Sequence, residues 1–468
     1  MILNRQLPVW LSICDLVLKP FKSVVKRLNL ASGTPRMGTK SNERLVVFFQ
    51  LKGHHVNAVQ NASDIVYDPS DPAVMADPFP VYARLRVKDP IHWSPSLKSW
   101  IVTRYTDVRD LLLSDDLSVK RLTGFYNSLP PPDAALLKDI IYYLNLWLAF
   151  RDPPDHTRVR RILRHAFTAK AIEDMRPNII DVTDMLLKRL DFSTKNNVDL
   201  IQEFALQVPA LVIMDLLDVP RDMLDNFKEW SDDMAVFIGG ARNSGDKYER
   251  AARGCQKMSG YFAELIEERA ENPKPGFLMD LITARDDGEK LSTDELIATC
   301  ILILFAGNET TTNLIGNSTL LLLRHPEQLA KLQADATLID SAIEEVLRFD
   351  GPTNALVRVV AKDHDLHGHK LSSGDRVFVM VNSANRDPLA FEDADQFDIT
   401  RNQNRHLTFG QGIHLCLGAK LAREEGRIAV ERLFRHFPKL ALDPVAAPEW
   451  LDAMVPRGMC RLPVLLNN

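Results

Sequence analysis

A glycine-punctuated loop that presents one cysteine and runs into a helix constrains this chain more than any other stretch. It reads FGQGIHLCLGAKLAREEGR over Phe409–Arg427, with Cys416 just before an amphipathic helix. A thiolate placed there gains from unpaired backbone N–H groups and from the positive end of the helix dipole. Gly410, Gly412 and Gly418 have no Cβ, so the backbone can bend tightly and a large flat group can approach the sulfur. Such a thiolate suits a haem iron, whereas a lone cysteine is more often a buried structural residue.

Composition places the chain among ordinary globular proteins and excludes several functions. Its 468 residues are 46% hydrophobic and 25% charged, and the net charge is −5. The charge balance gives no reason to expect nucleic-acid binding. The five cysteines are scattered, odd in number and never spaced C-x-x-C, so neither a disulfide framework nor a zinc site is indicated. We therefore expect a reducing, cytoplasmic location.

Residues 1–62 are predicted to form an N-terminal extension outside the main domain. Its first 42 residues hold seven basic residues and one acid. The apolar run Leu7–Leu18 contains Ser12 and Asp15, is too short to span a bilayer, and lacks a convincing cleavage site behind it. A secretory signal and a basic amphipathic segment on a membrane surface are the alternatives to a flexible or peripheral extension, which we favour.

Hydrophobic periodicity predicts a mainly helical chain with small β-sheets, an α+β fold. A proline-initiated helix follows Asp77-Pro78, and residues 91–105 alternate around a Ser-Pro turn as in a β-hairpin. The pattern weakens over Leu117–Leu148, where we expect a long irregular loop or lid. Helical spacing then dominates to about Leu323. Further segments are predicted as strands at 355–360, 366–371 and 375–381 and as a final helix at 417–437.

The longest helical pattern covers Thr293–Leu323 and carries a polar interruption. Ser292 and the acids that follow it form a good N-terminal signature. The first half is aliphatic on most sides, and the sequence AGNETTT then follows at residues 306–312. Glycine costs about 1 kcal/mol in a helix interior, and threonine hydroxyls can divert backbone hydrogen bonds. A local widening that admits a small ligand is the expected result.

Three motifs in order resemble those of cytochromes P450. The loop matches F-G-x-G-x-H-x-C-x-G, AGNET matches A/G-G-x-D/E-T, and EEVLR at 344–348 contains the E-x-x-R pair. The resemblance covers about residues 67–468 and is to the soluble bacterial type. It implies a single-domain P450 fold, assigned here to residues 63–468. It also implies that haem b lies between the long helix and the cysteine loop.

The resemblance also implies roles for individual residues. Cys416 would be the axial iron ligand, and Glu309 and Thr310 would relay protons to bound dioxygen. Two further sets would hold the haem and brace its loop. The haem-binding set is His156, Arg160, Ala306, Gly307, Arg358, Phe409, His414 and Gly418, with His156, Arg160, Arg358 and His414 at the propionates; the structural brace is Glu345, Arg348 and Arg401.

These residues favour a haem-thiolate monooxygenase that hydroxylates or epoxidises an apolar small molecule of secondary metabolism, such as a terpenoid, fatty acid or polyketide. The chain has no flavin, dinucleotide or iron–sulfur motif, so the resemblance implies a separate ferredoxin and ferredoxin reductase. Arg158, Arg161 and Arg164 are expected to form a solvated basic surface for that partner, and the protein is expected to be a monomer.

Two other functions compete with this interpretation. A peroxide-driven peroxygenase is disfavoured by the acid–alcohol pair, which serves mainly to protonate dioxygen, and a non-catalytic haem sensor would not need that pair. His364, His367 and His369 are interpreted as a solvated β-turn, because they lack carboxylates at metal-ligand spacing.

Overall fold

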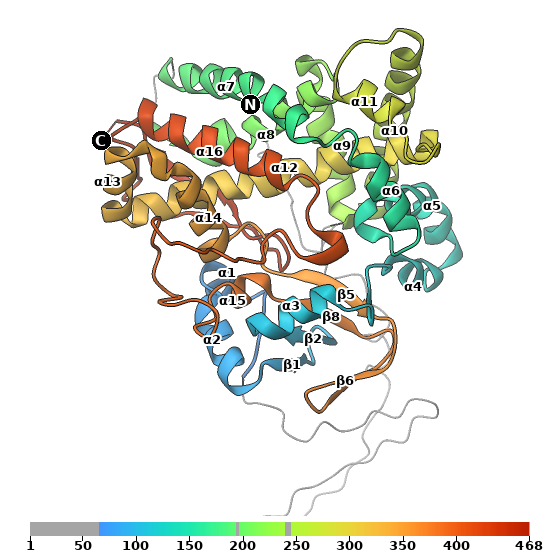
Figure 1. Ribbon diagram of the computed structural model, residues 1–468, viewed down its shortest axis with the longest axis horizontal. Helices are drawn as coiled ribbons and strands as arrows, with labels where there is room; N and C mark the ends of the chain where they lie inside the picture. Colours follow the sequence, from blue (N-terminus) through green and yellow to red (C-terminus); the bar gives the residue numbers. More distant parts are fainter. Residues whose placement is uncertain (1–64, 193–195, 239–244, 468) are drawn as a thin grey trace, which may run out of the picture.

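The computed structural model describes residues 65–192, 196–238 and 245–467. The predicted extension over 1–62 and the glycine pair Gly239-Gly240, expected to separate two helices, lie outside the described residues. Figure 1 shows a larger helical part and a smaller part in which most of the strands gather.

A five-stranded sheet organises the smaller part. Its strand order is β1-β2-β8-β5-β3, with β2 and β8 parallel and the other neighbours antiparallel. The strands are β1 Ile91–Ser94, β2 Ser99–Val102, β3 Leu117–Ser118, β5 Leu356–Val360 and β8 Arg376–Val379. The predicted hairpin is therefore confirmed, with Trp93 opposite Trp100.

Short helices cover both faces of this sheet because its strands alternate their side chains. Ile101, Val357 and Phe378 pack on one face with residues of α2 (Phe79–Lys88), and Val102, Val377 and Val379 pack on the other with residues of α3 (Tyr105–Leu113). Asp77 accepts a hydrogen bond from the first N–H of α2. The remaining short helices here are α1 Pro72–Ala76 and α15 Val381–Ala384.

The larger part is a packed set of helices around one long member, α12. Their bounds are α4 Leu122–Asn127, α5 Pro131–Leu146, η2 Leu148–Phe150, α6 Asp155–Leu163, α7 Ala169–Asp191, η3 Ile201–Ala205, α8 Gln207–Leu216, η4 Arg221–Met223, α9 Leu224–Ile238, α10 Lys247–Glu271, α11 Phe277–Thr283, α12 Thr293–Arg324, α13 Pro326–Ala334, η5 Ala336–Leu338, α14 Ile339–Asp350, η6 Gly412–His414 and α16 Ala419–His436. Small sheets complete the fold: β4 Asn197–Asp199 with β9 Ala441–Leu442 and β12 Pro463–Leu465, β10 Glu449–Trp450 with β11 Met459–Arg461, and β6 His364–Leu366 with β7 His369–Leu371.

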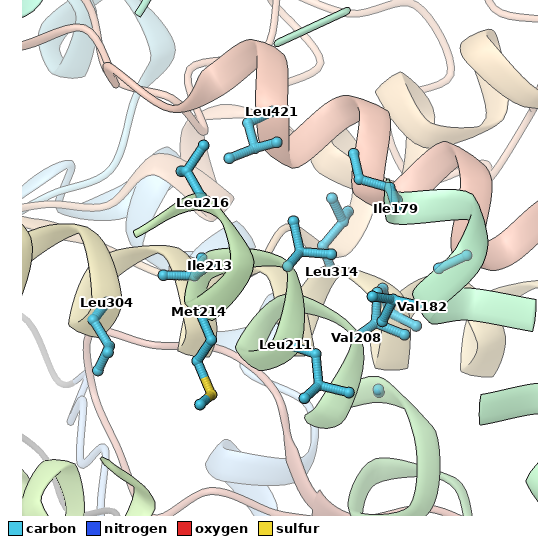
Figure 2. Packing of buried hydrophobic residues seen from close by; sticks show 14 of the residues in the cluster. Ile179, Val182, Val208, Leu211, Ile213, Met214, Leu216, Leu304, Leu314 and Leu421 are labelled. Atoms are coloured by element: carbon cyan, nitrogen blue, oxygen red, sulfur yellow. The ribbon is translucent and has the colours of Figure 1, made fainter. Parts of the chain in front are cut away.

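Helix α12 is the central element of this core. It begins with the predicted capping box, in which Ser292 and Glu295 each accept a hydrogen bond from the other's backbone N–H. It packs against α5, α8, α10, α14 and α16. Figure 2 shows Ile213, Met214 and Leu216 of α8 lying among side chains of α12, α7 and α16. A mainly helical fold with small sheets is thereby confirmed.

Two local expectations are wrong. The segment Leu117–Leu148 is not an irregular loop, because it forms β3, α4 and α5. Its buried residues Leu137, Ile140, Ile141 and Leu144 have the spacing of one helix face, which the three prolines before them obscured. Helix α12 does not widen either, since it is continuous through residues 306–312.

None of the helices within the described ranges is long and apolar enough to cross a membrane.

Candidate functional site

The cysteine loop folds as a tight turn that leads into α16. Gly410 and Gly412 have φ of 73° and 71°, in the left-handed region that a side chain disfavours. The N–H of Cys416 donates to the carbonyl of Phe409 at 2.9 Å, which closes the loop. Gly418 precedes α16 with φ of −84°, and a Cβ added to it would meet no atom within 4 Å. Open space therefore lies beside the sulfur.

Cys416 lies deep in the protein and is still exposed. Burial raises the pKa of its thiol, opposed by the Gly418 N–H and by the charges of Arg160 and Arg423. Cys416 is nevertheless exposed, whereas Cys255 and Cys300 are buried. Cys416 is therefore accessible, with protein on several sides of it. The only described cysteine with this geometry is the one in the loop.

The polar segment of α12, residues 306–312, is also partly accessible. Ala306 is exposed and Glu309 and Thr310 are half-buried, although the helix packs against neighbours along its length. The Thr310 hydroxyl donates to the Ala306 carbonyl at 2.8 Å. Burial raises the pKa of Glu309 to about 7. Gly307 serves packing, because a Cβ there would stand 2.5 Å from Cδ1 of Ile213 on α8.

Four predicted bases converge from three elements. His156 and Arg160 lie on α6, His414 ends η6, and Arg358 lies in β5. The rings of His156 and His414 are 4.3 Å apart between centroids. Burial, together with the nearby arginine charges, lowers their pKa values to about 4 and about 3. Both imidazoles are therefore neutral at pH 7.

Several nitrogens of this cluster have no partner among the described residues. Both ring nitrogens of His156 and Nε of Arg160 are buried there without a hydrogen bond. Within the same part of the chain, the only side-chain hydrogen bond of Arg358 goes to the carbonyl of Val357 at 3.0 Å. Buried donors are rarely left unpaired in native proteins, so this cluster indicates an acidic ligand.

The predicted brace surrounds one carboxylate. Glu345 and Arg348 are both fully buried, and Nε and a terminal nitrogen of Arg348 each lie 2.8 Å from a Glu345 oxygen. Arg401 donates from Nε to the same carboxylate at 3.2 Å. Asn404 and the N–H of Asp398 add two more donors at 3.0 Å. Helix α14 is thereby tied to the turns ahead of the cysteine loop.

Comparisons with known proteins agree with this geometry. A family model described as Cytochrome P450 matches residues 118–453. The "Vitamin D(3) 25-hydroxylase" of Pseudonocardia autotrophica is 39% identical over 397 residues, 84% of this chain and 94% of that protein. The chain belongs to the cytochrome P450 family.

Two solved P450 structures are similar to this one. The Bacillus subtilis 168 bacillaene polyketide synthase P450 PksS has a TM-score of 0.77 at 32% identity, over 86% of this chain and 100% of that one. P450BioI, in complex with an acyl carrier protein bearing hexadec-9Z-enoic acid, has a TM-score of 0.77 at 34% identity, over 84% and 99%. The protein is accordingly a P450 monooxygenase that binds haem b, with the iron held by a cysteine thiolate.

The residues of this P450 fit the haem. The exposed sulfur, the open space at Gly418 and the exposed Ala306 leave room for a flat macrocycle. The bases His156, Arg160, Arg358 and His414 suit its two carboxylates, since His156 and Arg160 have buried nitrogens without a partner among the described residues.

Sequence reasoning did not identify a second group of contacts, which links α16 and α14 to the cysteine loop. Arg423 of α16 lies 4.3 Å from the centroid of the Phe409 ring and pairs with Glu344, which also contacts His406 at 3.1 Å. Burial alone would raise the pKa of Glu344, but its interactions with His406 and Arg423 lower that pKa to about 2. Spacing gave no signal for these contacts, because they join three separate segments of this P450.

The exposed arginines expected on α6 and the three histidines of the predicted β-turn lie apart from this group of contacts. Arg158 is not part of a solvated surface, since it is half-buried and pairs with Glu295 of α12, whereas Arg161 and Arg164 are exposed. His364 and His369 lie in the β6–β7 hairpin, and His367 occupies its turn with φ of 51°. Among the described residues no group of three potential ligands could hold a metal ion.

Proposed function

We propose that this P450 uses O₂ and electrons from a separate ferredoxin to hydroxylate an apolar small molecule beside its haem. The observation that carries the proposal is that Cys416 and Ala306 of α12 are both exposed although burial perturbs the pKa values of Cys416 and of the nearby Glu309, which supports an open space at the site. We assign the catalytic unit to residues 63–468, which include the 118–453 stretch matched by the family model.

In this proposal Cys416 would hold the haem iron, and His156, Arg160, Arg358 and His414 would hold the propionates. The bound haem supplies iron chemistry that activates O₂ and oxidises a C–H bond, which the thiolate promotes. Gly418 donates its N–H to the sulfur, and the Arg160 and Arg423 charges also stabilise its anionic form. These groups oppose burial, which on balance still raises the pKa of the Cys416 thiol, so binding of the thiolate to iron would supply the rest.

Glu309 and Thr310 are proposed to deliver protons. A carboxyl group with a pKa of about 7 is partly protonated at neutral pH, so Glu309 can give up a proton and regain it. Thr310 already uses its hydrogen to bond the Ala306 carbonyl, and its oxygen remains free to accept a proton or a hydrogen bond. An acid and a hydroxyl on consecutive residues can therefore pass protons in both directions.

The substrate is proposed to be a lipophilic molecule. Leu302, Ile303 and Phe305 precede the polar segment and are only half-buried, although α12 lies in the core. The similar proteins named above are a vitamin D(3) hydroxylase, a polyketide synthase P450 and a P450 with a hexadecenoyl group. A long-chain or polycyclic hydrocarbon skeleton fits this combination.

The electron donor is proposed to dock near α6. Arg161 and Arg164 are exposed on this helix, and Arg160 of the same helix is close enough to act on the Cys416 sulfur. An acidic ferredoxin bound there would be steered by these charges and would lie close to the thiolate.

The test compares electron sources in the haem-loaded protein. We expect a reduced, CO-bound spectrum of the thiolate type, and product from a lipophilic substrate panel with NADPH, ferredoxin and ferredoxin reductase. Turnover with hydrogen peroxide alone, and none with the ferredoxin system, would replace the proposal with a peroxygenase. No turnover under either condition would favour a binding protein.

A further inference from the structure

A second cavity lies between α8, α9 and α12, on the side of α12 that faces away from the accessible Ala306. Its volume is about 40 Å³, which is room for about three water molecules. Met214, Phe227 and Leu304 belong to its apolar wall, and Figure 2 labels two of them, Met214 and Leu304. Leu304 and Asn308 of α12 line it two residues before and two residues after Ala306, and two residues turn an α-helix by about 200°. The cavity is therefore separate from the proposed haem site.

Asp232 of α9 lines this cavity and has no counter-charge in the described part of the chain. Its Oδ1 is buried there without a hydrogen bond. Two arginines of α10, Arg250 and Arg253, reach α9, but both bind the neighbouring Asp233, at 2.7 and 2.8 Å. Lys228 also lines the cavity, yet it is exposed and, within the described residues, forms no ion pair with Asp232. Burial raises the pKa of Asp232 to about 6, so the carboxylate is mostly ionised at pH 7.

The other polar groups of the cavity define the ligand that this carboxylate would accept. Ser231 is buried beside Asp232 on α9, and Asn308 faces them from α12, so a hydroxyl oxygen and an amide oxygen line the same cavity. The amide oxygen accepts from the Thr312 hydroxyl at 3.4 Å, which leaves it a second lone pair. One negative charge, two further acceptors and an apolar wall suit a cation that carries N–H donors on a short alkyl chain.

We propose that the cavity between α8, α9 and α12 is a binding site for a small organic cation, with Asp232 as its anionic contact. A guanidinium group fits this site best, because its planar fork meets a carboxylate with two parallel hydrogen bonds and it is less strongly hydrated than an ammonium group. An unpaired charge in a half-buried position is unfavourable, and the bound cation would supply the missing partner. The site does not depend on the function proposed at the haem, which lies on the other side of α12.

The experiment titrates full-length haem-loaded protein with n-butylguanidinium and with N-butylurea in a calorimeter. The two probes have nearly the same shape, but only the first carries a charge, and it has no free lone pair with which to bind iron. Loss of a charge-assisted hydrogen bond corresponds to about a tenfold change in affinity. We expect the wild type to bind n-butylguanidinium more tightly than N-butylurea, without a shift of the haem spectrum. Asp232→Asn should weaken binding of the cation about tenfold and leave binding of the urea unchanged.

Two control variants and a stability measurement complete the test. Glu229→Gln removes the same charge from an exposed residue of α9 that pairs with Lys257, and it should bind the cation as the wild type does. Lys228→Gln removes the cation that lines the cavity and should tighten binding. Because Asp232 has no partner to lose among the described residues, Asp232→Asn should keep or raise the midpoint of thermal unfolding.

Four results would overturn the proposal. They are no binding of n-butylguanidinium to the wild type at millimolar concentration, equal binding by the wild type and Asp232→Asn, a shift of the haem spectrum on titration, and a lower unfolding midpoint in Asp232→Asn. The third would place the cation at the haem, and the fourth would show that Asp232 has a structural partner instead of a ligand.

Discussion

Replacing Glu345 by glutamine tests whether the buried brace holds the fold together. The substitution preserves shape and turns one carboxylate oxygen into an NH₂ group. The oxygen with fewer donors accepts from Nε of Arg348 and from Asn404, so at least these two N–H groups would face another donor. Each buried donor left without an acceptor costs about 1–3 kcal/mol. Arg348 would also lose the charge that neutralises it, and breaking a buried pair costs about 3–5 kcal/mol in total, the unpaired donors included.

A loss of about 3–5 kcal/mol is large against the 5–15 kcal/mol that typically stabilises a folded protein. We expect urea unfolding, followed by tryptophan fluorescence and by haem absorbance, to show this decrease and reduced haem content. Glu431→Gln is the matched control, since Glu431 pairs with Arg435 on the exposed face of α16. An exposed pair of this kind contributes at most about 1 kcal/mol. If both variants lose the same small amount, the brace contributes no more than a surface pair.

Four further predictions concern the proposed site. Thr310→Ala is expected to keep haem and substrate binding but to divert electrons into hydrogen peroxide, measured as peroxide formed per NADPH; well-coupled turnover would contradict the relay. Because the pKa of Glu309 is about 7, coupling should fall as pH rises through 7 and the carboxyl loses its proton, and Glu309→Gln should remove that inflection from the pH profile. Cys416→Ala should abolish the thiolate-type spectrum of the reduced CO complex, and an unchanged spectrum would exclude this ligand. Arg160→Ala should increase the rate of haem loss several-fold without moving that spectrum, and normal retention would remove Arg160 from the propionate set.

The sequence predicted those helices and strands whose formation depends on residues close together in the chain. The hairpin at 91–102 followed from alternation around a turn, and the start of α12 followed from its capping box. The helix α5 was predictable as well, but three prolines led to a loop assignment. Proline at the first position of a helix is favourable, and Pro131 occupies it here.

Contacts between distant segments were not predictable in this way. The E-x-x-R pair is formed within one helix turn, but Arg401 reaches Glu345 over 56 positions, and only the family resemblance suggested that contact. The resemblance suggested neither the contact of Arg423 with the Phe409 ring nor the hydrogen bonds of Asp152 to the end of β3. Such contacts depend on how elements pack, and no spacing along the chain records them.

The distribution of hydrogen bonds distinguishes residues that stabilise the fold of this P450 from residues that are available to bind a ligand. Behind the cysteine loop, five donors satisfy the Glu345 carboxylate and leave it no capacity for a ligand. On α6, both ring nitrogens of His156 and Nε of Arg160 have no partner in the part of the chain that the structure describes. An unpaired buried donor costs about as much as a lost hydrogen bond, so a sequence keeps several together only where a ligand supplies the acceptors. The position of these bases therefore supports the proposal that the acidic edge of the cofactor lies beside α6, and this support does not depend on the motif.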